Sequence, residues 1–150
     1  LVILDSILNR IITNRRKGKQ TFVFIDEIYI LFMHEYSAQF LFKLWKRVRK
    51  YGAYCTGLTQ NVEDLLQSHT ARTMLSNSEF IIMLNQAATD RDELAKLLNI
   101  SDQQLSFIKN VSAGCGLIKV GSSLVPFENN FPKNTRLYRL MTTKPNDDFR

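Results

Sequence analysis

The stretch Phe22-Val23-Phe24-Ile25-Asp26-Glu27 decides the fold of this chain, because four apolar residues run directly into two adjacent carboxylates. An apolar run with large side chains on both faces is typical of a central parallel strand, since such a sheet is covered on both sides. Open α/β sheets bind ligands at the carboxyl ends of their strands. We therefore expect a buried strand over residues 21–26 that carries Asp26 and Glu27 to a ligand-binding edge.

A hydrophobic strand that ends in two acids is also the Walker B arrangement of nucleotide-hydrolysing enzymes. In that arrangement the first acid helps to hold Mg²⁺ and the second polarises a water molecule. The same pattern fits a strand that ends at the surface with two solvated acids, because short motifs have many false positives. The companion phosphate loop, G-x-x-x-x-G-K-[ST], does not occur in the 150 residues.

Length and composition indicate one globular domain rather than a disordered or membrane-spanning chain. The 150 residues are 45% hydrophobic and 23% charged, and no apolar stretch is long enough to cross a bilayer. A net charge of +6 permits an acidic partner such as nucleic acid, nucleotide or anionic lipid without identifying it. Cys55 and Cys115 lack metal-ligand spacing and are expected to be reduced and buried. The first residue is not Met, so we expect the chain to begin partway through a longer protein.

Strands alternate with helices through the middle of the chain, which favours an α/β fold with a mostly parallel sheet flanked by helices. Ser37 is placed to cap one helix, and Gly52 is placed to end it. A hairpin is expected across Gly121-Ser122, and an extended polar tail over residues 132–150. Helices are expected over residues 1–12, 38–51, 62–67, 71–75 and 90–98 and after Ser101, and strands over residues 21–26, 53–59, 79–84, 116–120 and 123–127.

Two residues around the second expected strand strengthen the interpretation of the acid pair. Gln60 follows the apolar segment at residues 53–59, and a glutamine there can orient the attacking water or sense a γ-phosphate. An ordinary polar strand end has the same sequence. Arg49 lies eleven positions before Gln60, in a basic stretch that also fits a solvated helix face. In a ring-forming ATPase such an arginine can reach a neighbour's nucleotide.

Several stretches together resemble the VirB4-like conjugative transfer ATPases, most closely those of Gram-positive conjugative transposons. The strongest are FIDE at residues 24–27, LWKRVRKYG at 44–52 and TQNVEDLL at 59–66. Further matches are ARTMLSNS at 71–78, Asn85-Gln86, and LYRLMTT at 137–143. The likeness covers nearly the whole chain, and the joint spacing is more specific than any single motif.

The resemblance implies the C-terminal part of a RecA-like P-loop ATPase core, in the HerA/FtsK group of hexameric motors. Residues 1–150 would form a partial ATPase domain that runs from Walker B to the C-terminus. By the same resemblance Asp26 is the acid associated with Mg²⁺, Glu27 is the catalytic base and Gln60 is the sensor glutamine. ATP and Mg²⁺ are the implied ligands of the intact protein.

Arg49 falls where the arginine finger of this group precedes the sensor strand, and Arg47 and Arg72 are rivals for that role. The implied partners are other copies of the protein in a hexameric ring, further type IV secretion components and possible DNA. The resemblance also implies a cytoplasmic location, with peripheral association at the inner face of the cell membrane.

This chain departs from the family pattern at one decisive point. Family members carry the phosphate loop far upstream, beyond a largely helical insertion, and this chain starts after both. Without the loop's amides and lysine there is no cradle for the β- and γ-phosphates. We therefore expect a C-terminal fragment that is inactive by itself.

Three functions remain open from the sequence. The first is an ATPase that powers conjugative DNA transfer through a type IV secretion system. The second is a DNA-pumping motor of the HerA/FtsK kind, which would bind DNA in a strongly salt-dependent way. The third is a non-catalytic module that folds and serves only in assembly.

Overall fold

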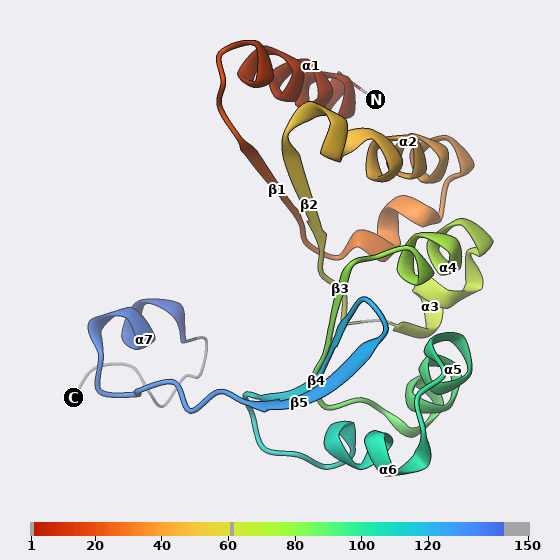
Figure 1. Cartoon of the computed structure of the whole chain (residues 1–150), viewed down its shortest axis with the longest axis vertical. Coiled ribbons are helices and arrows are strands. Elements are labelled where there is room, and N and C mark those ends of the chain that lie inside the picture. The colour runs from red at the N-terminus through yellow and green to blue at the C-terminus, as the bar shows by residue number, and fades with distance from the viewer. Residues whose placement is uncertain (1, 61, 143–150) are drawn as a thin grey trace.

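The computed structural model describes residues 2–60 and 62–142, and within them helices separate the strands except for the last two, which are consecutive (Figure 1). The strands are β1 (Thr21–Ile25), β2 (Ala53–Gly57), β3 (Phe80–Met83), β4 (Cys115–Val120) and β5 (Ser123–Glu128). The α-helices are α1 (Val2–Arg16), α2 (Glu35–Arg47), α3 (Val62–Gln67), α4 (His69–Ser76), α5 (Ala88–Leu98), α6 (Asp102–Leu105) and α7 (Arg136–Met141). Three short 3-10 helices are η1 (Ile28–Phe32), η2 (Val48–Tyr51) and η3 (Ser106–Ile108).

The strands form two separate sheets. β1 and β2 pair in parallel, with a register that runs from Thr21 opposite Ala53 to Ile25 opposite Gly57. β3 pairs antiparallel with β4, and β4 pairs antiparallel with β5. The α/β class, the parallel strands joined through a helix, and the hairpin are therefore confirmed. Parallel pairing is confined to β1 and β2 among the described strands, because β4 returns along β3 in the opposite direction.

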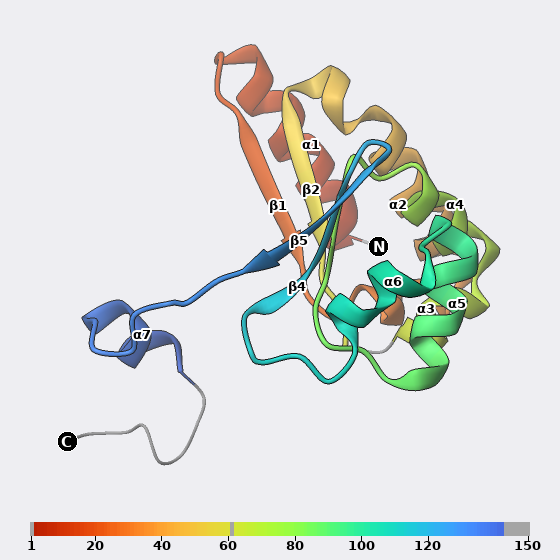
Figure 2. The same cartoon turned by 60° about the horizontal axis from the view of Figure 1, so that its bottom comes forward.

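Within residues 2–60 and 62–142, helices cover one face of the β1–β2 pair and leave the other face bare. In the views of Figures 1 and 2, α1 and α2 lie on the same side of these strands. The side chains of Phe22 and Phe24 on the other face are 60% and 70% exposed. The expectation that this strand is buried on both faces is thus not met within the described residues, since no described element packs on the second face.

The core lies between the strands and the helix layer, and α3 joins its parts. Leu66 of α3 packs with the β3 and β4 side chains, whereas Leu65 of the same helix packs with η1, α2 and α4. A third cluster joins α1, α2, η2 and β2 through Ile11, Leu44 and Val48. The helix layer is therefore continuous across the two sheets, although the strands are not.

The ends of the helices follow the sequence signals in most places. Gly52 ends η2 in the left-handed region at φ 62°, and Ser101 forms a capping box with Gln104 at the start of α6, as expected. The expectation that Ser37 caps its helix is wrong. α2 begins at Glu35, three residues before the expected start, and the Ser37 hydroxyl donates instead to the carbonyls of Leu31 and His34, at 2.5 and 3.0 Å.

The C-terminal segment corrects the expectation of an extended tail over residues 132–150. α7 forms within it, because the Thr135 hydroxyl accepts a hydrogen bond from the Tyr138 N–H at 3.2 Å and caps the helix. The views of Figures 1 and 2 agree that α7 stands away from the rest of the chain. Residues 143–150 lie outside the described residues. None of the described helices has the length and apolar character needed to span a membrane.

Candidate functional site

The acid pair and Gln60 come together at the carboxyl edge of the β1–β2 pair. Asp26 and Glu27 directly follow β1, and Gln60 lies three residues beyond the end of β2. Because the strands are parallel and in register, both carboxyl ends meet at one edge. The Glu27 Oε2 atom accepts a hydrogen bond from the Gln60 N–H at 3.5 Å. The structure thus brings together three of the predicted site residues.

Two hydrogen bonds to one residue hold the turn that carries the acids. The Leu58 N–H donates to the Ile25 carbonyl at 2.8 Å, and the Leu58 carbonyl accepts from the Ile28 N–H at 2.9 Å. Asp26 and Glu27 are looped out between these two bonds. The Asp26 Oδ1 atom accepts the Glu27 N–H at 3.0 Å, which orients the Asp26 carboxylate.

Glu27 has an unusual backbone conformation for a residue with a side chain. Its φ and ψ are 47° and 48°, in the left-handed region that costs a non-glycine residue about 1–2 kcal/mol. Such conformations persist only where the surrounding structure holds them, and they are concentrated at functional sites. The strain therefore lies on the residue that the sequence marks as the catalytic base.

Gly57 is a further residue of this site that the sequence analysis did not single out. A Cβ atom at this position would lie 2.6 Å from Cδ1 of Ile28, which is too close, and 3.3 Å from its Cγ2, which is tight. Ile28 directly follows Glu27 and is 5% exposed. A glycine within an apolar strand is a known signal of close approach, and it could have pointed to this position.

Asp26 fits the part of a single protein carboxylate on Mg²⁺. It is exposed, and its Oδ2 atom has no hydrogen bond within the described part of the chain. Across residues 2–60 and 62–142, no group of three or more His, Cys, Asp or Glu side chains could hold a metal without other ligands. Mg²⁺ commonly binds through one or two carboxylates together with substrate phosphates, and Asp26 suits that mode.

The structure does not bring Arg49 to the acid pair of the same chain. Arg49 lies in η2, at the amino end of β2, and its side chain is exposed. β2 has five residues at about 3.3 Å each, so about 16 Å separates the two edges. Arg47 ends α2 at the same amino edge. Neither arginine can therefore serve Asp26 and Glu27 within one subunit in this conformation.

Arg72 is held within its own chain. Its Nε–H donates to the Leu66 carbonyl, and its Nη2 atom lies 3.6 Å from Oε2 of Glu93. The ion pair is half exposed and contributes little stability by itself, whereas the bond to the carbonyl fixes the side chain against α3. These contacts give Arg72 a structural role between α3, α4 and α5.

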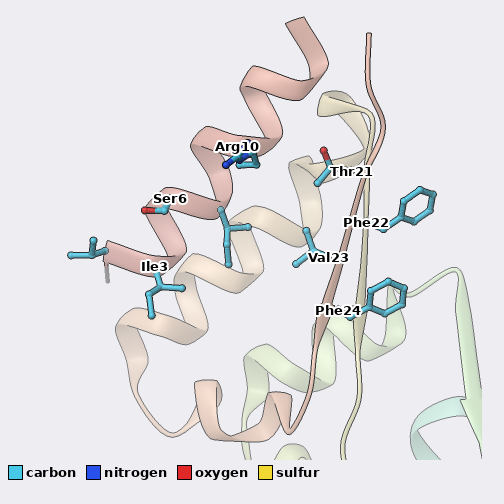
Figure 3. Close-up of a pocket in the computed structure, with 9 residues that line it drawn as sticks. Ile3, Ser6, Arg10, Thr21, Phe22, Val23 and Phe24 are labelled. Atoms are coloured by element: carbon cyan, nitrogen blue, oxygen red, sulfur yellow. The ribbon is translucent and has the colours of Figure 1, made fainter. Parts of the chain in front are cut away.

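A shallow depression of about 560 Å³ lies between α1 and β1, away from the acid pair. Figure 3 shows Val23 pointing towards the helices and Phe22 and Phe24 pointing away from them. Its lining includes Ile3 and Arg10 and none of the predicted site residues. This depression is therefore separate from the edge that carries Asp26 and Glu27.

The two cysteines, Cys55 and Cys115, are not part of this site. Cys55 and Cys115 are free and half-buried, so the expectation of full burial is met only in part. Burial raises the pKa of the Cys55 thiol to about 11, which keeps it protonated and unreactive at neutral pH.

Comparison with known proteins gives a family and a solved relative. Residues 1–115 match the family model of the TraG P-loop domain. The fold is similar to the structure of VirB4 of Thermoanaerobacter pseudethanolicus, with a TM-score of 0.76 and 25% sequence identity over 84% of this chain. The chain spans 34% of that VirB4 chain, and no protein with a curated description matches it. With more than half of its length matched, this chain belongs to the TraG P-loop domain family and has a VirB4-like α/β fold.

Proposed function

We propose that this chain is the catalytic part of a motor ATPase that powers conjugative DNA transfer through a type IV secretion system. The observation that carries the proposal is the hydrogen bond between Glu27 and the Gln60 backbone at the carboxyl edge of two parallel strands. Membership of the TraG P-loop family and likeness to VirB4 support the class of protein. The energy-coupling step and the molecule that is moved are part of the proposal.

Each residue at this edge has a distinct proposed task. Glu27 accepts a proton from a water molecule as the water oxygen bonds to the γ-phosphorus and the bond from that phosphorus to the bridging oxygen breaks. Gln60 orients that water or senses the γ-phosphate. Asp26 would hold Mg²⁺, which neutralises charge on the phosphates when bound.

The phosphates themselves need a cradle that this chain does not supply. The chain has no G-x-x-x-x-G-K-[ST] sequence, whereas the matched VirB4 chain is about 2.5 times as long. We infer that the phosphate-loop part of the intact protein covers the bare face of β1 and β2, where Phe22 and Phe24 are exposed. Such cover gives a parallel sheet the second layer that these sheets need. The 150 residues alone are then inactive.

The position of Arg49 supports a ring rather than a monomer as the working form. An arginine about 16 Å from the acids of its own subunit can contribute to hydrolysis only at a neighbour's site. A hexameric ring at the cytoplasmic face of the membrane, in contact with other secretion components, fits this requirement.

The test is an ATP hydrolysis assay on the intact protein. Glu27→Gln keeps the size of the side chain and removes the base, so turnover should fall to background while nucleotide binding persists. The matched control is Glu63→Gln, which makes the same exchange at an exposed position in the first turn of α3 and should leave turnover unchanged. Turnover that survives Glu27→Gln would refute the catalytic assignment.

A DNA-translocating motor of the HerA/FtsK kind is the second candidate. The net charge of +6, with six cations at residues 15–19 and 49–50, favours contact with a polyanion. This candidate requires DNA binding that weakens steeply with salt and turnover that DNA stimulates. A third possibility is that the chain serves only in assembly, and an intact protein without ATPase activity would favour it.

A further inference from the structure

We propose that Gly57 and Ile28 are a positioning pair for Glu27. The absence of a side chain at Gly57 admits Ile28, and Ile28 in turn fixes the strained turn that presents the Glu27 carboxylate. The inference deepens the proposed function and rests on the role that it gives Glu27. It assigns a task to two apolar positions.

The first step is that packing, and not backbone conformation, explains the glycine. The φ angle of Gly57 lies outside the left-handed region, so an alanine could adopt its backbone conformation. What opposes alanine is the Ile28 side chain, with Cδ1 2.6 Å and Cγ2 3.3 Å from the added Cβ. An alanine at this position therefore acts on Ile28 specifically.

The second step is that Ile28 has little room in which to move. It is 5% exposed and belongs to the buried cluster that includes Leu41, Leu65 and Met74. Protein interiors are close-packed, so a displaced side chain either adopts a poor rotamer or carries its backbone along. A methyl group at residue 57 should therefore push the Ile28 backbone as well as its side chain.

The third step links Ile28 to the carboxylate. The Ile28 N–H holds the Leu58 carbonyl at 2.9 Å, and Ile28 is covalently joined to Glu27, whose backbone is in the left-handed region. When Ile28 moves, the constraint that maintains the Glu27 conformation is lost and the backbone relaxes. The Glu27 carboxylate then loses its hydrogen bond from the Gln60 N–H, which it now accepts through Oε2 at 3.5 Å.

The test compares Gly57→Ala with Gly57→Ala/Ile28→Val in the intact protein. Valine lacks Cδ1, so the double variant removes the 2.6 Å contact and keeps a buried side chain. Gly57→Ala should lower kcat for ATP about 10- to 100-fold with KM within about twofold of wild type, since small misplacements of a catalytic group have effects of that size. The double variant should regain most of the loss. Ala53→Gly, which exchanges the same methyl at the other end of β2, should leave kcat unchanged.

A second variant covers the case in which Gly57→Ala does not fold. Ile28→Ala removes the anchor, and kcat should fall at least about tenfold with KM unchanged. Its matched control is Leu41→Ala in the same buried cluster, which should lower the melting temperature comparably and leave kcat unchanged. Equal kcat losses in the two variants would show a general stability effect and overturn the proposal.

A readout independent of activity separates this inference from the proposed function. Amide hydrogen exchange at Gln60 reports the hydrogen bond to Glu27, and it should be faster in Gly57→Ala and slower again in the double variant. If the wild-type protein does not hydrolyse ATP, the proposed function fails, and the exchange rates still decide whether Gly57 and Ile28 position Glu27. Unchanged exchange at Gln60 in Gly57→Ala, or wild-type kcat in that variant, overturns the inference.

Discussion

The two ends of the β1–β2 pair carry opposite charge. The carboxyl end holds Asp26 and Glu27, and no acidic residue occurs in residues 6–25 or 36–62 on either side of it. Parallel pairing brings equivalent ends of the two strands together, so cations far apart in the sequence meet at the amino end. The exposed cations there are Arg15, Arg16, Lys17, Lys19, Arg49 and Lys50.

Because of this separation, the acids and Arg49, to which we assign roles in one proposed reaction, cannot meet within one subunit. About 16 Å of strand separates the basic end from the acids. A head-to-tail contact, in which the amino end of one copy faces the carboxyl end of the next, would bring them together, and repeated contacts of this kind form a ring when the rotation between subunits closes. Variants at each end test whether it has the role that this arrangement gives it.

The largest expected effect is that of Arg49→Ala in the intact protein. An arginine that stabilises charge on the transferred phosphoryl group contributes about 10³-fold or more to turnover. We therefore expect about a 10³-fold loss of kcat with little change in nucleotide binding, measured by steady-state hydrolysis and by equilibrium titration. Lys50→Ala removes the adjacent cation and should have little effect on turnover.

Mixed rings decide whether Arg49 acts across the interface. Subunits with Arg49→Ala retain Glu27, and subunits with Glu27→Gln retain Arg49, so some interfaces of a mixed ring are complete. Activity should reappear on mixing, although neither variant has it alone. If demonstrably mixed rings stay inactive, the two ends of the β1–β2 pair do not cooperate in the way proposed, and Arg47 becomes the next arginine at that end to test.

The second effect concerns the carboxyl end and Gln60. Gln60→Ala removes the side-chain amide and keeps the backbone N–H that holds Glu27. We expect kcat to fall about 100-fold, because the attacking water or the γ-phosphate loses the group that positions it. The turn that carries Glu27 should stay intact. Gln67→Ala, at the exposed end of α3, is the matched control. A wild-type kcat in Gln60→Ala would leave only the backbone of this residue in the site.

The arrangement of the acid pair follows from local sequence patterns. An apolar run that ends in Asp26 and Glu27, and a second that ends before Gln60, already predict parallel strands whose polar ends meet. The capping box at Ser101 and the hairpin across Gly121-Ser122 are equally local, and the structure confirms both. In each case a few neighbouring residues determine the conformation.

The remaining features depend on contacts between distant residues. The left-handed backbone of Glu27 has no local signature. The glycine within the apolar strand signals a close approach at Gly57, but it does not identify Ile28 as the residue that makes it. Serine is a suitable residue type for a helix cap, but the Ser37 hydroxyl donates instead to the carbonyls of Leu31 in η1 and of His34. The exposure of Phe24 depends on which element covers that face of the sheet, and the residues of the strand do not specify that element.

A third, smaller effect concerns stability at the carboxyl end. Glu27→Gly and Glu27→Ala both remove the carboxylate, but only glycine adopts a φ of 47° without strain. We expect the glycine variant to have a free energy of unfolding about 1 kcal/mol higher than the alanine variant, measured by denaturant titration of the intact protein. At positions with negative φ the order is the reverse, and the alanine variant is the more stable of the two. If alanine is the more stable, the turn does not hold Glu27 under strain.

A further effect on stability lies between the two ends, at Cys55 in the middle of β2. Burial raises the pKa of this thiol from 9.0 to about 11, so the folded state keeps the proton that the unfolded state releases. The contribution to stability is therefore complete below pH 9 and is lost as the pH rises from 9 to about 11. Over that range the wild type should lose more stability than Cys55→Ala, in which no thiol titrates, as measured by unfolding at each pH. Parallel pH profiles would mean that the thiol is solvated, and that the helices do not seal this side of β2 between its acidic and basic ends.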